Sequence, residues 1–221
     1  MRMSERVTEK GQAIYSKKVL SIYDFWVLGV SNHLFWKCPT RKISNHFLDC
    51  VSPNHLDVGV GTGYYLKNYL PKKTKRIALL DMNRNSLSEA SNAISHFQPE
   101  IYQADVLNMH DLCVEKFDSI SVNYLLHCLP GNFVEKSILF ENLKNLLSDE
   151  GVLFGSTILG KGVEVNFCAQ KIMNIYNKKG IFCNFDDDYD SLSKSLSEHF
   201  SKVDIRIIGC VALFSCKNKK S

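Results

Sequence analysis

The 221-residue sequence has no apolar run of the length that crosses a bilayer, which takes about 20 consecutive apolar residues. The first six residues are polar and contain no apolar signal core. The net charge is only +4, and the short basic runs are not interleaved with aromatic residues as in nucleic-acid-binding patterns. These absences predict a cytoplasmic protein with no membrane span and no nucleic-acid partner.

The eight cysteines form no C-x-x-C pair and lack the histidine spacing of a zinc site. Several lie within apolar stretches, where buried thiols are common. We therefore expect reduced, structural cysteines and no bound metal. Most of the histidines also show no partner pattern in the sequence, namely His33, His46, His55, His96, His110 and His199.

From residue 55 onward, short apolar runs alternate with segments of helical periodicity. The predicted strands are 55–58, 76–80, 100–103, 117–123, 152–158, 203–208 and 211–216. The predicted helices are 64–69, 86–97, 133–147 and 189–200. Because parallel strands need crossover connections, this order predicts a doubly wound α/β sheet, and the tight joint at Gly209 makes the last strand antiparallel to its neighbour.

Two segments fall outside this alternation. Residues 12–38 carry aromatic residues at helical spacing and predict two short helices, either as plain cover or as a lid that seals a ligand. Residues 160–188 follow the fifth strand at the carboxyl end of the sheet, where ligands bind, and are predicted to be a substrate cap. No repeat or linker is evident, so residues 1–221 are expected to form one domain.

The run LDVGVGTGY has glycines at alternate positions directly after an apolar strand. Gly59, Gly61 and Gly63 lack the side chains that would block close approach of a ligand to the backbone. Asp81 ends the next apolar run, a pattern typical of a carboxylate that binds a ribose. The dinucleotide fingerprint needs a further glycine where Tyr64 stands, which disfavours a nicotinamide cofactor.

This G-x-G-x-G spacing resembles the first motif of the class I methyltransferases that use S-adenosylmethionine. The resemblance extends over about residues 56–158 and implies a Rossmann-like, mostly parallel seven-stranded sheet with an antiparallel terminal strand and helical caps. It implies that the three glycines approach the methionine moiety of the cofactor. Asp57 would then orient its amino group, and Asp81 would accept both ribose hydroxyls.

The same resemblance extends to the ends of the next strands. It implies that Met82 and Val106 sandwich the adenine and that Asp105 accepts from its exocyclic amine. Asn123 begins the run NYLLHCLP, which is similar to a motif of small-molecule methyltransferases that faces the transferred methyl group. His127 in this run is either a general base or a polar cap on the following helix.

Three of these residues also have a purely structural interpretation. Asp81 stands where a helix N-cap is common, and Asp105 stands where a turn residue is common. Asn123 has the position of a group that satisfies the backbone at a strand end. The sequence leaves both interpretations open.

The N-terminal segment resembles that of the ubiquinone and menaquinone methyltransferase group. That group carries a Tyr-Asp pair, here Tyr23 and Asp24, followed by a tryptophan before a basic residue, here Trp36 and Lys37. The resemblance implies that Tyr23 and Trp36 border the cofactor and that Lys37 lies at its carboxylate.

Together these features predict a methyltransferase that passes a methyl group from S-adenosylmethionine to a small organic acceptor by in-line displacement. The nucleobase-type run with two prolines is absent after Asn123, which disfavours a nucleobase acceptor. Two alternatives stay open at this point: a methyltransferase acting on RNA or protein, and a non-catalytic module that binds the cofactor. The methylated atom and the oligomeric state also stay open.

Overall fold

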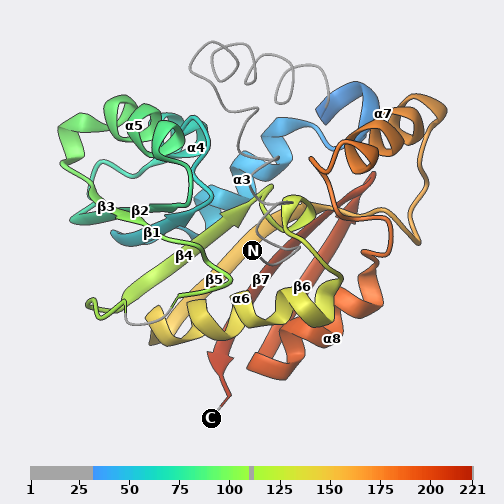
Figure 1. The fold of residues 1–221 in the computed structure, drawn as a ribbon. Helices are drawn as coiled ribbons and strands as arrows, with labels where there is room; N and C mark the ends of the chain where they lie inside the picture. Colours follow the sequence, from blue (N-terminus) through green and yellow to red (C-terminus); the bar gives the residue numbers. More distant parts are fainter. Residues whose placement is uncertain (1–31, 110–111, 221) are drawn as a thin grey trace.

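The structure is a computed structural model that describes residues 32–109 and 112–220 (Figure 1). A seven-stranded sheet with the order β3-β2-β1-β4-β5-β7-β6 forms its centre. The strands are β1 (Asn54–Val58), β2 (Arg76–Asp81), β3 (Glu100–Gln103), β4 (Phe117–Asn123), β5 (Leu147–Ile158), β6 (Phe200–Ile208) and β7 (Val211–Lys219). Strands β1 to β5 run parallel, and β7 is antiparallel to both of its neighbours. The predicted fold class is confirmed.

Helices cover both faces of the sheet (Figure 1). One face carries α3 (Thr40–Cys50), α4 (Tyr64–Tyr69) and α5 (Arg84–Ala93), and the other carries α6 (Phe133–Leu146) and α8 (Tyr189–His199). A further helix, α7 (Phe167–Lys178), lies in the connection between β5 and α8. Two short 3-10 helices cover Ser95–Phe97 and Leu126–Cys128.

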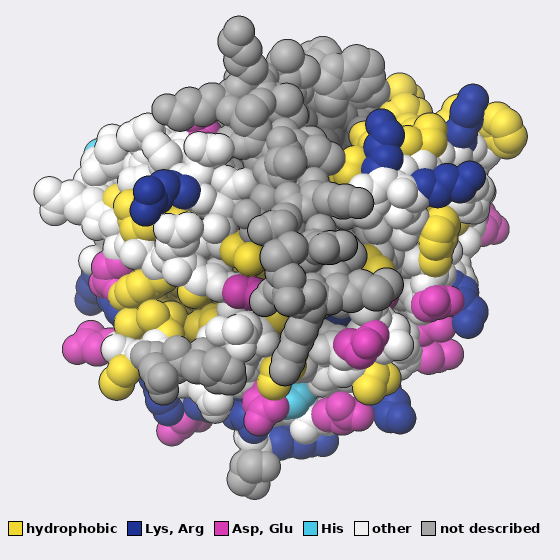
Figure 2. Space-filling model, in the orientation of Figure 1, with side chains coloured by type: hydrophobic (Ala, Val, Ile, Leu, Met, Phe, Trp, Pro, Cys, Tyr) yellow, Lys and Arg dark blue, Asp and Glu magenta, His cyan; other side chains and the backbone are white. Residues whose placement is uncertain are grey.

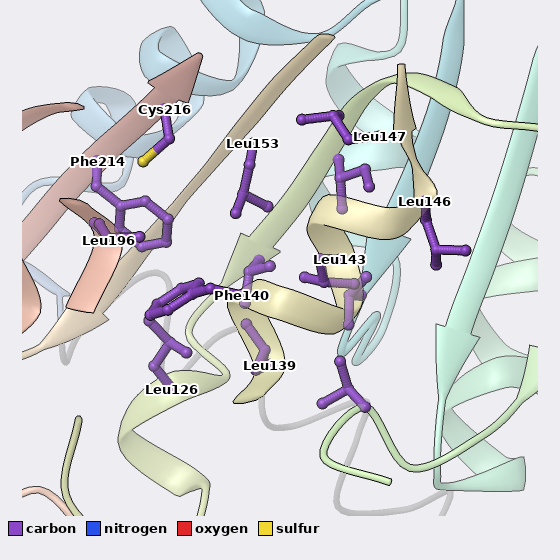
Figure 3. Packing of buried hydrophobic residues seen from close by; sticks show 14 of the residues in the cluster. Leu126, Leu139, Phe140, Leu143, Leu146, Leu147, Leu153, Leu196, Phe214 and Cys216 are labelled. Carbon is purple, nitrogen blue, oxygen red and sulfur yellow. The ribbon is translucent and has the colours of Figure 1, made fainter. Parts of the chain in front are cut away.

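The largest apolar core lies between the sheet and the helices α6 and α8. Figure 3 shows Leu139, Phe140 and Leu143 of α6 packed with Leu153 of β5 and Phe214 of β7. A second layer covers the opposite face of the sheet. Since both faces are covered, the strands read as nearly continuous apolar runs, as expected for a parallel sheet.

Two helices depart from the sequence prediction. The sequence pattern predicts no helix at α3, because its buried face includes the polar residues Thr40, Ser44 and His46 and so shows no apolar helical period. It also indicates irregular structure in the region of α7. There the exposed apolar side chains of Phe167 and Ile175 blur a buried face formed by Ala169 and Met173.

The sequence Asp-Glu-Gly at 149–151 is typical of a turn and predicts one before a strand at 152–158, but these residues lie within β5, so this prediction is wrong. Phe117 pairs with Leu147, whereas Ser119, only two residues further along β4, pairs with Val152. Strand β5 therefore carries extra residues opposite Asp118, which is the irregularity of a bulge. The turn-like composition marks this bulge rather than the start of the strand.

The predicted N-terminal lid falls largely outside the described residues. Only 32–38 of the predicted 12–38 segment belong to the described part, and residues 32–35 form one π-helical turn there. Within residues 32–109 and 112–220, no helix combines the length and apolar character needed to cross a membrane.

Candidate active site

Predicted site residues from three strands lie at the carboxyl edge of the sheet, beside β1 and β4. The chain leaves β1 towards β2 and β3 and then returns to β4 on the other side of β1. This reversal is the topological switch point at which open α/β sheets bind ligands. The glycine loop follows β1, Asp81 ends β2, and Asn123 ends β4.

All three glycines of the loop adopt the left-handed conformation that other residues rarely take. The φ angles of Gly59, Gly61 and Gly63 are 73°, 53° and 74°. A Cβ at Gly59 would lie 3.0 Å from the Leu125 side chain, and one at Gly63 would lie 3.0 Å from the Ala90 Cα. A Cβ at Gly61 would meet no atom of the described residues within 4 Å. Gly61 is therefore the glycine that faces open space.

Asp81 lies against the glycine loop rather than capping a helix. Its Oδ1 accepts the Asn83 N–H at 2.8 Å, and the N–H groups of Val60 and Gly61 also hydrogen-bond its carboxylate. The N-cap of α5 is Asn83, whose side chain accepts from the next turn, so the N-cap interpretation of Asp81 is wrong. Burial raises the pKa of Asp81 to about 6, although these backbone donors lower it.

Asp57 is a second buried carboxylate at the same edge. Its Oδ1 accepts a hydrogen bond from Ser121 Oγ of β4. Burial raises the pKa of Asp57 to about 7, the Ser121 hydrogen bond lowers it, and the neighbouring charge of Asp81 raises it further. In the described part of the chain, neither carboxylate forms an ion pair. Two desolvated carboxylates with raised pKa values mark a candidate site for a cationic ligand.

Two buried polar atoms near this edge have no hydrogen-bond partner among the described residues: Asn123 Nδ2 and the Tyr65 hydroxyl. Asn123 Oδ1 accepts from Ser156 Oγ at 3.0 Å, which orients the amide. Asn123 does not satisfy the backbone at the strand end through these atoms. Because buried donors are nearly always paired, Asn123 Nδ2 is a donor that suits a ligand.

The three residues predicted at the adenine have different surroundings. Met82 follows Asp81 and is half-buried. Asp105 Oδ1 accepts the Leu107 N–H at 3.0 Å, which is the geometry of a turn residue. Val106 is 5% exposed and packs within the larger core. Their contacts with adenine stay predictions.

His127 lies buried in the 3-10 helix after β4. Its Nδ1 lies 3.4 Å from the Ile158 N and 3.5 Å from the Thr157 Oγ1. Because a backbone N–H only donates, Nδ1 accepts, and the hydrogen of the neutral ring is on Nε2. Burial lowers the pKa of His127 to about 3, and the charge of Lys136 adds to this effect. The N-cap of α6 is Asn132, so His127 does not cap that helix.

Only part of the run carried over from the quinone-methyltransferase resemblance belongs to the described residues. Tyr23 and Asp24 lie outside the described residues. Trp36 is 2% exposed, its ring centroid lies 6.1 Å from that of Phe182, and its carbonyl accepts the Cys210 N–H. Lys37 is exposed, with a φ of 51°. The cofactor contacts of Tyr23, Trp36 and Lys37 stay predictions.

A buried ion pair anchors part of the segment that the sequence predicts as a substrate cap. Lys136 of α6 and Asp187 are 0% and 1% exposed, with Nζ 2.7 Å from Oδ2. Lys136 Nζ also donates to the Cys183 carbonyl at 2.8 Å, and the Cys183 N–H donates to the His127 carbonyl. These bonds hold the Phe182 ring 4.5 Å from the His127 ring. The sequence analysis assigns no partner to either charge.

Three of the histidines that show no partner pattern in the sequence have hydrogen-bond partners in the structure. His46 Nε2 lies 2.8 Å from the Phe214 carbonyl oxygen, and His199 Nε2 lies 2.9 Å from Ser137 Oγ. His55 lies between two serine hydroxyls of β4. The available signal was the alternation of polar residues in β1 and β4, which places them on one face of each strand.

Comparison with known proteins shows similarity in both sequence and fold. Residues 56–153 match a family described as "Methyltransferase domain". The chain is 40% identical to the physcion biosynthesis cluster O-methyltransferase of Aspergillus chevalieri, over 96% of this chain and 97% of the relative. It is 36% identical to the demethylluteothin O-methyltransferase of Streptomyces thioluteus, over 92% of this chain and 89% of the relative.

The solved structure of N-methyltransferase NodS from Bradyrhizobium japonicum WM9, in complex with S-adenosyl-L-homocysteine, has a similar fold. Its TM-score is 0.65 at 15% identity, with 97% of each chain covered. Among residues 32–109 and 112–220, no three His, Cys, Asp or Glu side chains are grouped to hold a metal ion. Fold, motif and relatives agree, and the chain belongs to the class I S-adenosylmethionine-dependent small-molecule methyltransferases.

Proposed function

We propose that the protein methylates a hydroxyl oxygen of a small, largely apolar acceptor, and that this hydroxyl is acidic, as in a phenol or an enol. The names of the two relatives, both O-methyltransferases, support oxygen as the methylated atom. The acidic hydroxyl is inferred from the surroundings of His127, which is buried and accepts the Ile158 N–H at Nδ1, so that the neutral ring is placed to donate rather than to take up a proton. An apolar acceptor fits the Phe182 and Tyr124 rings, whose centroids lie 4.5 Å and 5.5 Å from that of His127.

The described residues fit the cofactor. S-adenosylmethionine carries positive charge at its amino group and sulfonium, which suits the desolvated carboxylates of Asp57 and Asp81. We place its amino group at Asp57 and its ribose hydroxyls at Asp81, with Asn123 Nδ2 as a further donor and Met82, Asp105 and Val106 around the adenine. When bound, this cofactor supplies a methyl group activated by the sulfonium.

In the acceptor site, His127 acts as a hydrogen-bond donor. We find no partner for its Nε2 among the described residues, and the Nδ1 contacts leave the hydrogen on Nε2. With a pKa of about 3, the ring does not take up a proton near neutral pH. A phenol, with a pKa near 10, ionises far more readily than water, with a pKa of about 15.7, and so needs less help from a base. Donation from Nε2 would stabilise the anionic oxygen.

Replacing His127 with alanine is expected to lower kcat/KM for a phenolic acceptor by about 10- to 100-fold, the effect of one hydrogen bond to a charged group. Because the neutral ring does not titrate near neutral pH, the shape of the pH profile between about pH 6 and 9 should not change. Formation of S-adenosylhomocysteine with a panel of phenols of graded pKa measures this, with His199→Ala as control. A loss of about 10²- to 10⁴-fold that removes an ionisation would instead show a general base.

The segment 160–188 forms the acceptor side of the site in this proposal. Its helix α7 buries Ala169 and Met173 in the apolar cluster that also holds Phe182. Apolar side chains lie beside lysines at the upper right of Figure 2, over the region of α7. Phe167, the first residue of this helix, is 83% exposed. The variation of such caps among related folds would set acceptor choice.

Replacing Gly61 with alanine is expected to weaken S-adenosylhomocysteine binding by about 10- to 100-fold while the protein still folds. The left-handed φ costs an L-residue about 1–2 kcal/mol, and the new Cβ meets no described atom within 4 Å. In the proposed complex, the new Cβ would clash with the bound cofactor. Calorimetry measures the affinity and thermal unfolding the fold. Gly63→Ala is the matched control, because its Cβ would press on Ala90 and destabilise the fold first. Unchanged affinity in Gly61→Ala would contradict the placement.

Two narrower inferences accompany this proposal. All eight cysteines are free thiols, which supports a reducing compartment such as the cytoplasm. The likeness of Tyr23 and Trp36 to the ubiquinone and menaquinone group supports a hydroxylated ring as the acceptor, which is compatible with the phenol proposed above.

A further inference from the structure

A chain of hydrogen bonds leads from the cofactor edge towards the opposite end of β1 and β4. Ser121 Oγ contacts Asp57 Oδ1 and lies 3.0 Å from His55 Nε2. His55 Nδ1 lies 2.7 Å from Ser119 Oγ, which lies 2.9 Å from Ser52 Oγ. The strands pair His55 with Ser119 and Asp57 with Ser121, so these side chains share one face of the sheet.

When Asp57 is a carboxylate, the hydrogens have one arrangement. Ser121 O–H must then donate to Asp57, and therefore His55 donates to Ser121 from Nε2. His55 Nδ1 is left as an acceptor and takes the hydrogen of Ser119. The neutral ring is in its Nε2–H tautomer.

When Asp57 is protonated on Oδ1, the whole chain can reverse. The carboxyl O–H donates to Ser121, and Ser121 donates to His55 Nε2. The Nδ1–H of His55 donates to Ser119, whose own hydrogen goes to Ser52. Ser52 in turn donates to the Asn54 carbonyl at 2.8 Å. The ring is then in its Nδ1–H tautomer.

We propose that this chain is a proton path from Asp57 to solvent at Ser52, and that His55 is a positioning residue whose tautomer follows the protonation state of Asp57. The O–H bond of Asp57 breaks, each of the four groups after it receives one hydrogen and passes one on, and one proton leaves to water from the half-buried Ser52. The link to the cofactor rests on the proposed place of its cationic amino group at Asp57, which favours the carboxylate.

The residues around His55 and Asp57 are compatible with a proton path. Burial lowers the pKa of His55 to about 3, so the ring changes tautomer without becoming charged. Phe47 of α3 and Phe154 of β5 pack on the ring, with centroids 5.6 Å and 5.9 Å away, and neither titrates. Asp57 faces two further titratable groups, the carboxyl of Asp81 from β2 and the Tyr65 hydroxyl from α4.

The tautomer of His55 is measured by nitrogen NMR on the full chain labelled with ¹⁵N-histidine. We expect Nδ1–H at about pH 5.5 and Nε2–H at about pH 8.5 without cofactor, and Nε2–H at both pH values with S-adenosylhomocysteine bound. The His55 tautomer should still respond to pH in Asp81→Asn, which would show that the response does not follow the titration of Asp81. A purely structural histidine would keep one tautomer under all of these conditions, and that result would overturn the proposal.

Two variants at Ser121 test the path itself. Ser121→Ala removes the hydroxyl that links Asp57 to His55 and should leave the His55 tautomer insensitive to pH. Ser121→Thr keeps the hydroxyl and should keep the response. If Ser121→Ala does not fold, Asp57→Asn takes its place with the same expectation. Persistence of the response in these variants would overturn the path. The pH series uses no acceptor, so its outcome does not depend on whether the protein methylates oxygen. If the His55 tautomer responds to pH but not to S-adenosylhomocysteine, only the link to the cofactor is overturned.

Discussion

Asp81→Ala is expected to lower the affinity for S-adenosylhomocysteine by at least about 100-fold. Two hydrogen bonds from ribose hydroxyls to a carboxylate contribute about 1.5–3 kcal/mol each, and alanine removes both. The carboxylate lies between the glycine loop and the start of α5, where it accepts hydrogen bonds from the backbone N–H groups of Asn83, Val60 and Gly61. Isothermal titration calorimetry on the purified chain measures the loss.

Asp118→Asn is the matched control for this variant. Asp118 is an exposed carboxylate near the amino end of β4, where it accepts from Ser148 at 2.9 Å, far along the strand from the site. Its affinity should equal that of the wild type. If Asp81→Ala retained affinity within about fivefold of the wild type, the carboxylate would not be the ribose ligand.

The two buried carboxylates of the site, Asp57 and Asp81, should lower the stability of the protein when no cofactor is bound. Burial raises the pKa values of Asp57 and Asp81 to about 7 and 6, above their ordinary value of about 3.9. The folded state thus binds these protons more tightly than the unfolded state, so their contribution to stability falls as pH rises from about 4 to 7. Asp81→Asn should therefore unfold at a higher temperature than the wild type at about pH 8, and this gain should shrink towards pH 4.

Asp187→Leu is expected to lower the free energy of unfolding by about 3–5 kcal/mol, because it leaves the charge of Lys136 buried and unpaired. Lys136 Nζ would keep only the Cys183 carbonyl as an acceptor among its described contacts. Urea unfolding measures the change through the midpoint and slope. Since this pair anchors the segment that holds Phe182 on His127, acceptor turnover should fall with it.

The double variant Lys136→Met and Asp187→Leu separates the charge from the packing. Apolar side chains of similar volume often replace a buried ion pair without loss, so the double variant should recover most of the stability. A double variant as unstable as Asp187→Leu would show that packing around Asp187, not the unpaired charge, causes the effect.

The glycine loop and Asp81 were predictable because their constraints are local. Three left-handed backbone positions require glycine within five residues, and the acid stands directly after an apolar strand. The same holds for the parallel strands, whose apolar runs are short and bounded by turns. The proposed cofactor side of the site is therefore the part that local sequence patterns predict.

The rest depends on contacts between distant parts of the chain. The His55 chain requires the register of β1 against β4, which the sequence does not state. Lys136 and Asp187 lie 51 residues apart and look like ordinary surface charges in the sequence. Helix α3 presents buried serine, threonine and histidine, so its period is not apolar. Of these contacts, the pair of Lys136 and Asp187 supports the proposed acceptor side.

The most direct test of the account is a calorimetric titration of the wild-type chain with S-adenosylhomocysteine and, separately, with NAD. We expect micromolar binding of S-adenosylhomocysteine, lost in Asp81→Ala, and no binding of NAD. Binding of NAD in place of S-adenosylhomocysteine, or binding that Asp81→Ala leaves unchanged, would contradict it.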